Sequence, residues 1–148
     1  VPFGKIIDTD ETCPTLTYNR IGRHQSKLVR TRIASNKSPW LMNTEVGEIY
    51  TVPISHGEGR FIAGTQLLQN LADNGQIITQ YVDLSSNPTD KIQYNPNGSD
   101  WAVEGLISPD GRVLGKMGHS ERIGSGLYRN VPGRFDMQMF ESAVRYFK

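Results

Sequence analysis

Residues 102–122 read AVEGLISPDGRVLGKMGHSER and hold the clearest local signal for the fold. Two β-prone runs, residues 102–107 and 112–117, flank the tetrapeptide SPDG. Proline at the second position and glycine at the fourth position of such a segment are typical of a tight turn between two strands. The stretch therefore predicts a β-hairpin whose second strand ends beside His119.

His119 and Glu121 are the candidate catalytic pair. In an extended segment, residues i and i+2 point to the same side, with Cα atoms about 6 to 7 Å apart. The carboxylate could then orient the imidazole, whose other nitrogen could take a proton from a nucleophile and return it to a leaving amine. The pair lacks a nucleophile, and a surface turn with no chemistry would have the same short pattern.

The composition is that of one soluble globular domain. The chain has 148 residues, of which 36% are hydrophobic, and this is enough to bury a core. Lysine and arginine number 16 against 15 acidic residues, so the charge indicates neither nucleic acid nor a membrane as a partner. Without a long apolar run or a signal-like start, and with one cysteine, the sequence predicts a cytoplasmic protein.

Further strands and two helices are predicted outside the hairpin. Residues 48–54 and 77–82 have the composition of strands. Residues 65–73 fit a short helix with Thr65 as its N-cap, and residues 135–147 fit a second helix. Four apolar side chains recur along this second helix at helical spacing and are predicted to form one packed face: Phe140, Ala143, Val144 and Phe147. Strands and helices together predict an α/β layered domain with a mixed sheet.

A basic stretch lies among two β-prone runs in residues 16–33. In the second run Val29, Thr31 and Ile33 share one face, as expected of a half-buried strand. No acidic residue lies between Thr12 and Thr44, whereas six basic residues do: Arg20, Arg23, Lys27, Arg30, Arg32 and Lys37. Such a run could bind phosphate, but it is more often a solvated face or a docking surface for another domain.

Residues 55–60, SHGEGR, form the second candidate site. Gly57 and Gly59 remove two side chains next to a histidine and an acid, so the backbone could approach a ligand closely; a tight turn between strands is the alternative. The pattern His-x-Glu occurs here and again at His119, and the two could ligate Zn²⁺ or Fe²⁺ if the segments converged.

Three stretches in order carry a resemblance to a known family: PISHGEGRF at 53–61, YNPNGS at 94–99 and VLGKMGHSER at 113–122. They resemble the glutaminase domain of phosphoribosylformylglycinamidine synthase, a class I, triad-type glutamine amidotransferase of purine biosynthesis. The similarity runs over nearly the whole chain, and HGEGR together with NPNGS is specific to this family. It implies a three-layer α/β fold with a mixed, mostly parallel sheet, of which residues 1–148 form a single partial domain, the C-terminal portion.

The resemblance also implies the chemistry and the partners. A Cys, His, Glu triad would hydrolyse L-glutamine and pass ammonia to a synthase domain that uses ATP to amidate formylglycinamide ribonucleotide. His119 would be the general base and Glu121 its orienter, and glutamine would bind at Ser55, His56, Gly57 and Glu58, largely through backbone groups. ATP and Mg would bind in the partner synthase domain, and no cofactor or metal is expected in this portion.

Two departures from the family pattern stand out. The usual MPHPER reads MGHSER here, so glycine and serine replace the prolines at positions 118 and 120. The GxCxG turn that carries the nucleophilic cysteine is not in this sequence, and the resemblance places it just before Val1. Cys13 has acidic neighbours that disfavour a thiolate, so it is expected to be inert.

Overall fold

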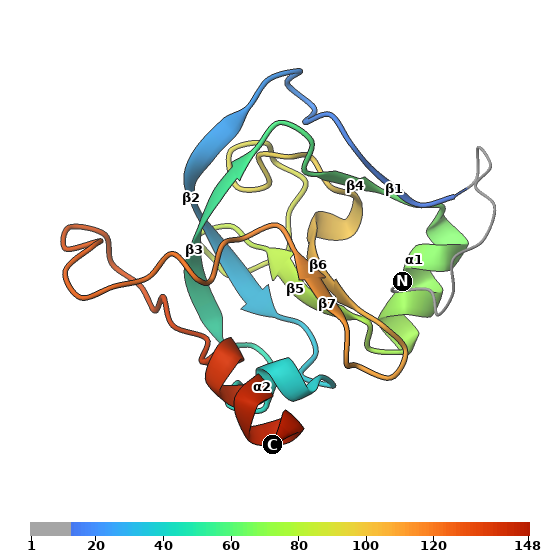
Figure 1. Cartoon of the computed structure of the whole chain (residues 1–148). Helices are drawn as coiled ribbons and strands as arrows, with labels where there is room; N and C mark the ends of the chain where they lie inside the picture. Colours follow the sequence, from blue (N-terminus) through green and yellow to red (C-terminus); the bar gives the residue numbers. More distant parts are fainter. Residues whose placement is uncertain (1–12) are drawn as a thin grey trace.

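Seven strands and two α-helices form in residues 13–148, the part of the chain that the structure, a computed structural model, describes (Figure 1). In chain order they are β1 (Thr15–Thr17), β2 (Gln25–Ile33), β3 (Ile49–His56), β4 (Arg60–Ile62), α1 (Thr65–Asp73), β5 (Ile77–Tyr81), β6 (Val103–Ile107), β7 (Leu114–Lys116) and α2 (Met139–Phe147). Two short 3₁₀ turns, η1 (Pro39–Leu41) and η2 (Asp100–Ala102), complete the set. Neither α-helix of this part is long and apolar enough to cross a membrane.

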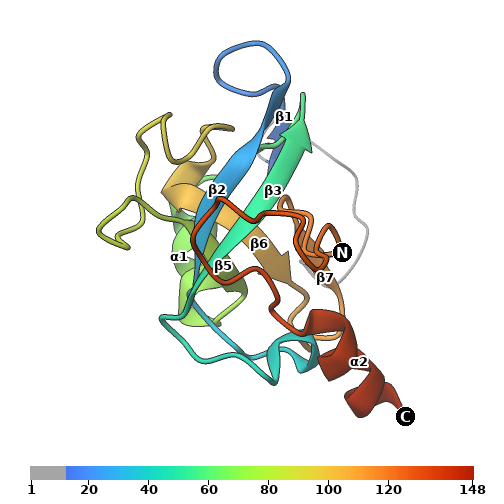
Figure 2. The ribbon, with the colours of Figure 1, turned by 90° about the vertical axis from the view of Figure 1, so that its left-hand side faces the viewer.

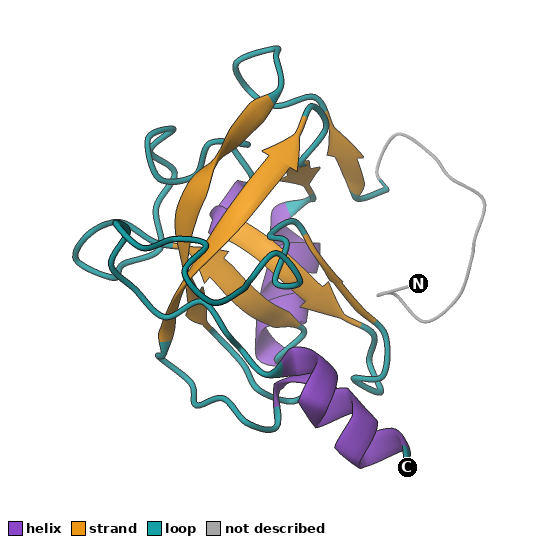
Figure 3. Ribbon diagram, turned by 60° about the vertical axis from the view of Figure 1, so that its left-hand side comes forward, coloured by secondary structure: helices purple, strands orange, loops and turns teal. Residues whose placement is uncertain are grey.

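The main sheet has the strand order β3-β2-β5-β6-β7, and every neighbouring pair is antiparallel. Strands β1 and β4 form a separate antiparallel ribbon. The α/β class is confirmed, but the expectation of a mixed, mostly parallel sheet is wrong for residues 13–148. Parallel neighbours need a long crossover between them, whereas a tight turn joins β6 to β7 and α1 leads from the small ribbon into the main sheet. Figure 3 shows α1 along one side of the sheet and α2 at its end, rather than two full helical layers.

The predicted hairpin is confirmed in the described part. Strands β6 and β7 pair with Ile107 opposite Leu114. The turn closes with a hydrogen bond from the Gly111 N–H to the Ser108 carbonyl oxygen at 2.9 Å. Gly111 has φ of +74°, a left-handed conformation that glycine adopts without steric cost.

The sheet curls, so that the segment after β7 returns to the far edge strand β3 (Figure 2). The His119 N–H donates to the Pro53 carbonyl oxygen at 2.8 Å, and the Thr51 N–H donates to the Arg134 carbonyl oxygen at 2.7 Å. These bonds cover backbone groups of β3 that an open sheet edge would leave exposed. The curl therefore brings together two segments that lie more than fifty residues apart in the sequence.

Two hydrophobic clusters hold the fold. One contains Tyr50, Val52, Ile54, Ile78 and Tyr81, together with Met137 and Met139 at the start of the C-terminal helix. The other joins Leu68 and Leu71 of α1 to Phe61, Ile77, Val103 and Leu106. The predicted buried face of β2, formed by Val29, Thr31 and Ile33, is confirmed.

The two helices depart from prediction in detail. Helix α1 has the predicted bounds, but its N-cap is Gly64, with no side-chain cap, and not Thr65. Helix α2 begins at Met139, because Gln138 adopts a left-handed conformation with φ of 52° and residues 135–138 are not helical.

The predicted packed face of α2 is wrong. Phe140, Val144 and Phe147 are 56%, 51% and 55% exposed, and only Ala143 of the four is buried. The side of the helix that is buried carries Met139, Ser142 and Ala143. Helical periodicity identified an apolar face but not what would cover it, and within the described residues that face remains largely uncovered.

Candidate active site

His119 and Glu121 are in direct contact just after β7. The distance from His119 Nδ1 to Glu121 Oε1 is 2.7 Å. The pair lies in a tight turn, closed by a hydrogen bond from the Arg122 N–H to the His119 carbonyl oxygen at 3.1 Å, and not in the extended segment that was expected. Arg122 Nε lies 3.7 Å from the same carboxylate oxygen.

The carboxylate of Glu121 is held in its ionised form. Partial burial acts to raise its pKa, but hydrogen bonds from its own backbone N–H and from His119, with the charge of Arg122, lower the pKa overall. An ionised carboxylate at Nδ1 favours the tautomer with a proton on Nδ1, which leaves the lone pair on Nε2. The geometry therefore prepares Nε2 of His119 to accept a proton.

The Nε2 atom of His119 is buried and has no hydrogen-bond partner among residues 13–148. The side chain as a whole is 25% exposed and lines a pocket of about 380 Å³, to which Trp40, Gly118, Met139 and Phe140 also contribute. A buried polar atom without a partner is uncommon and costs stability. This nitrogen is thus available to a reacting group that is not part of the described chain.

His56, the last residue of β3, stacks on His119. Their ring centroids are 5.0 Å apart and the ring planes differ by 7°. Burial, and next the neighbouring His119, lower the pKa of His56, and its Nδ1 is also buried without a partner in the described part. The two sequence motifs predicted to carry the site therefore meet, through the curl of the sheet.

This stacking does not make a metal site. The nitrogen lone pairs of two parallel, stacked rings lie in their own planes and do not converge on one point. Among residues 13–148 no group of three or more His, Cys, Asp or Glu side chains could hold a metal ion. The alternative of a metal-binding module therefore has no geometric support in that part of the chain.

The other residues of the SHGE segment differ in their environments. Side chains alternate along a strand, so Ser55 points away from His56, and its Oγ lies 3.3 Å from His24 Nε2. Glu58 is exposed. A Cβ atom on Gly57 would have no heavy atom within 4 Å, so open space adjoins this backbone.

Gly59 is tightly enclosed by residues that sequence reasoning did not assign to the site. The amide of Asn97 donates to the Gly59 carbonyl oxygen at 3.0 Å, and the Gly59 N–H donates to Asn19 Oδ1 at 3.1 Å. The Ser99 hydroxyl accepts a hydrogen bond from the Phe61 N–H, two residues further along, at 3.1 Å. Asn97 is fully buried, so the NPNGS stretch builds the floor that supports the SHGEGR turn.

Three members of the basic run bind carbonyl or amide oxygens of neighbouring segments. Lys27 Nζ donates to the Gln93 carbonyl oxygen at 2.8 Å, and Arg32 donates to the Gln80 side chain at 3.2 Å. Arg30 donates to the Asp83 and Leu84 carbonyl oxygens at 3.1 and 2.9 Å. The contacts of Lys27 and Arg30 fasten the segment that follows β5, and the contact of Arg32 ties β2 to β5.

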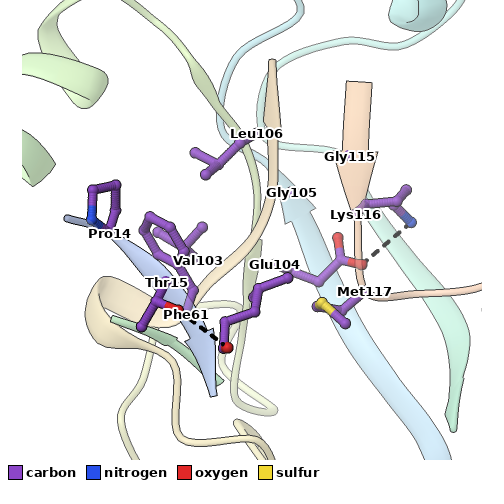
Figure 4. Close-up of a pocket in the computed structure, with 11 residues that line it drawn as sticks. Pro14, Thr15, Phe61, Val103, Glu104, Gly105, Leu106, Gly115, Lys116 and Met117 are labelled. Carbon is purple, nitrogen blue, oxygen red and sulfur yellow. Dashed lines mark hydrogen bonds and ion pairs between the residues drawn. The ribbon is translucent and has the colours of Figure 1, made fainter. Parts of the chain in front are cut away.

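A second pocket, an apolar groove of about 370 Å³ that His119 does not line, lies between β1 and the pair β6 and β7 (Figure 4). Pro14, Leu16, Phe61 and Val103 contribute to its lining. Among the described residues, 13–148, its charged lining residues are Glu104 and Lys116, which form an ion pair at 3.4 Å. Cys13 lines neither this groove nor the His119 pocket.

A histidine held by a carboxylate, beside a glycine-containing turn on a curled sheet, has the geometry that the acid–base part of a triad site requires. The chain belongs to the CobB/CobQ-like glutamine amidotransferase domain family, whose model matches residues 1–147. It is similar to the phosphoribosylformylglycinamidine synthase subunit PurQ of Natronomonas pharaonis, with 39% identity over 113 residues, covering 76% of this chain and 50% of that protein. The same subunit of Thermus thermophilus is 36% identical over 107 residues, covering 72% of this chain and 45% of that protein.

A solved structure has the same fold. A chain in the structure of PurLQS from Thermotoga maritima matches with a TM-score of 0.67 and 26% sequence identity, over 92% of this chain and 54% of that chain. The chain thus spans about half the length of the relatives that it matches.

Proposed function

We propose that this chain supplies the acid–base half of the glutaminase site of a phosphoribosylformylglycinamidine synthase. The observation that carries the proposal is the contact of His119 with Glu121 beside a pocket that His119 lines, because the buried Nε2 atom of His119 has no hydrogen-bond partner among residues 13–148. The similarity to PurQ subunits supports glutamine as the substrate and the remainder of the synthase as the partner. ATP and Mg are assigned to that partner, and no step of the glutaminase reaction requires them.

In the proposed reaction, a cysteine thiolate attacks the side-chain carbonyl carbon of L-glutamine. His119 has taken the thiol proton on Nε2 and now gives this proton to the departing amide nitrogen. Ammonia leaves, and a thioester between the cysteine and the glutamyl group remains. His119 then takes a proton from the water that hydrolyses the thioester to glutamate. Glu121 holds Nδ1 throughout and stabilises the imidazolium form.

Glutamine is proposed to bind along the SHGE segment. Gly57 has open space beside its backbone, which would permit a close approach of the substrate. The ring of His56 stacks on His119, so this segment lies next to the proposed base. Ser55 is proposed to contribute through its backbone, because its side chain points to His24.

The nucleophile is proposed to come from a segment other than residues 13–148. Cys13 lies outside the His119 pocket, and the relatives are about twice as long as this chain. That segment is proposed to pack on the exposed apolar face of α2, where Phe140 also lines the His119 pocket.

Labelling with an electrophilic glutamine analogue tests this assignment. A protein that contains this chain together with a PurQ-type nucleophile segment should be labelled on the cysteine of that segment, as read by peptide mass spectrometry. L-Glutamine should protect that cysteine, and Cys13→Ser should leave the labelling unchanged. Labelling of Cys13 that glutamine prevents would contradict the proposal.

A further inference from the structure

We infer that Glu104 and Lys116 are positioning residues for the general base: together they pin the residues on either side of His119. This inference rests on the proposed role of His119. Glu104 is the second residue of β6 and lies outside the stretches that identified the site, whereas Lys116, the last residue of β7, lies within the 113–122 stretch but had no role assigned to it.

Glu104 holds the residue before His119. Its carboxylate accepts a hydrogen bond from the Gly118 N–H through Oε1 and one from the Thr79 hydroxyl through Oε2. The Glu104 backbone adds a third contact, because its carbonyl oxygen accepts from the Met117 N–H at 2.9 Å. The side chain is 0% exposed, so solvent does not compete for these bonds.

Lys116 holds the residue after His119. Its ammonium group lies 3.4 Å from Glu104 Oε1 and donates to the Ser120 hydroxyl at 2.9 Å, and its side chain is 7% exposed (Figure 4). His119 itself is fixed between these two anchors by its N–H bond to the Pro53 carbonyl oxygen. The base is therefore held at three consecutive residues, 118, 119 and 120.

The contacts around Gly118 leave no room for a side chain at this position. A Cβ atom there would lie 2.6 Å from Val52 Cγ2 and 2.7 Å from Glu104 Oε1. A proline at this position would also lack the N–H that Glu104 accepts. Gly118 and Ser120 leave the backbone freer than prolines at these positions would. The buried hydrogen bonds of Glu104 and Lys116 restrain these two residues instead.

The placement of the ion pair favours a positioning role over a contribution to stability alone. A buried ion pair can often be replaced by apolar residues with no loss of stability, so its presence is weak evidence for a stabilising function. Among residues 13–148, the hydrogen bonds of the two charged groups, apart from those to Thr79 and Met137, end on the loop that carries His119.

The first readout is the imidazole of His119, followed by ¹⁵N NMR on the folded chain, and it does not depend on activity. The unsubstituted protein should have one tautomer, with the proton on Nδ1. Glu104→Ala should give broadened or averaged imidazole signals, whereas Glu104→Gln, which keeps an oxygen for the Gly118 N–H, should restore the single tautomer. If Glu104→Ala does not fold, Ser120→Ala removes only the Lys116 anchor and should give a smaller change of the same kind.

The second readout is glutamine hydrolysis in a protein that contains the nucleophile. Misplacing a catalytic group by about 1 Å can cost about 100-fold in rate, so Glu104→Ala should lower kcat by about 10- to 100-fold. KM should stay within about twofold of the starting value, because the proposed substrate contacts on β3 are unchanged. Leu71→Ala, a buried change on the α1 side of the sheet, is the control, and it should lower stability without this fall in kcat.

The outcomes separate the two claims. Unchanged NMR signals for His119 and unchanged kcat in Glu104→Ala, with only reduced stability, would overturn the positioning role. A second outcome is that Glu104→Ala disturbs the imidazole signals while the unsubstituted protein hydrolyses no glutamine. This outcome would support the positioning of His119 and refute the proposed function.

Discussion

Two glycines of the SHGEGR turn give a matched pair of substitutions with opposite expected effects. A Cβ atom on Gly59 would overlap the Asn97 side-chain amide and lie 2.8 Å from Asn97 Cγ, whereas one on Gly57 would meet nothing within 4 Å. Neither glycine has a positive φ that would itself disfavour alanine. The two Gly→Ala changes therefore differ in the space available and not in backbone strain.

Gly59→Ala should lower the free energy of unfolding by about 1 to 3 kcal/mol, the usual cost of overpacking a well-filled site. Displacing Asn97 would also endanger its 3.0 Å hydrogen bond to the Gly59 carbonyl oxygen, a loss of about 1 kcal/mol. Gly57→Ala should instead be neutral or stabilise by up to about 1 kcal/mol, because it restricts the unfolded chain.

Urea unfolding measures both differences, and in thermal melts each kcal/mol corresponds to a shift of about 2 to 4 °C. If glutamine uses the open space beside Gly57, the stable Gly57→Ala protein should have a raised KM in the glutaminase assay. Equal stability of the two variants would refute the steric argument. An unchanged KM in Gly57→Ala would remove this backbone from the proposed glutamine site.

Two further predictions concern regions outside the site. Hydrogen bonds from the Tyr50 hydroxyl, from Arg134 and from the Glu45 N–H lower the pKa of Glu48 from its usual 4.5 to about 2. The stability that this carboxylate contributes is therefore present above pH 4.5 and is lost as the pH falls toward 2. Glu48→Gln should flatten this part of the curve of unfolding free energy against pH. Phe140→Ser on α2 should change the free energy of unfolding of this chain by less than about 0.5 kcal/mol, because the side chain is exposed. A larger loss of stability in urea unfolding would mean that this face of α2 is packed.

Features with a local cause were predictable from the sequence. The β6–β7 hairpin follows from SPDG, because turn chemistry acts over four residues. The buried face of β2 follows from alternation, and the bounds of α1 follow from its apolar spacing. The contact between His119 and Glu121 was also predicted, although a turn and not an extended segment produces it.

Features that depend on distant packing were not predictable in the same way. The antiparallel sheet departs from the expectation that came with the family resemblance. The stacking of His56 on His119 depends on the curl of the whole sheet, for which no short pattern exists. Glu104 gave no signal, because one acidic residue in an apolar strand becomes informative only when its buried partners are known.

Ammonia release from L-glutamine tests the central claim most directly. The assay should use a protein that joins this chain to a PurQ-type nucleophile segment, with His119→Ala and Cys13→Ser compared with the unsubstituted protein. Loss of the general base should lower kcat by about 100- to 10,000-fold, and Cys13→Ser should leave it unchanged. Full activity in His119→Ala, or loss of activity in Cys13→Ser, would contradict the assignment of His119 as the base that serves a cysteine outside residues 13–148.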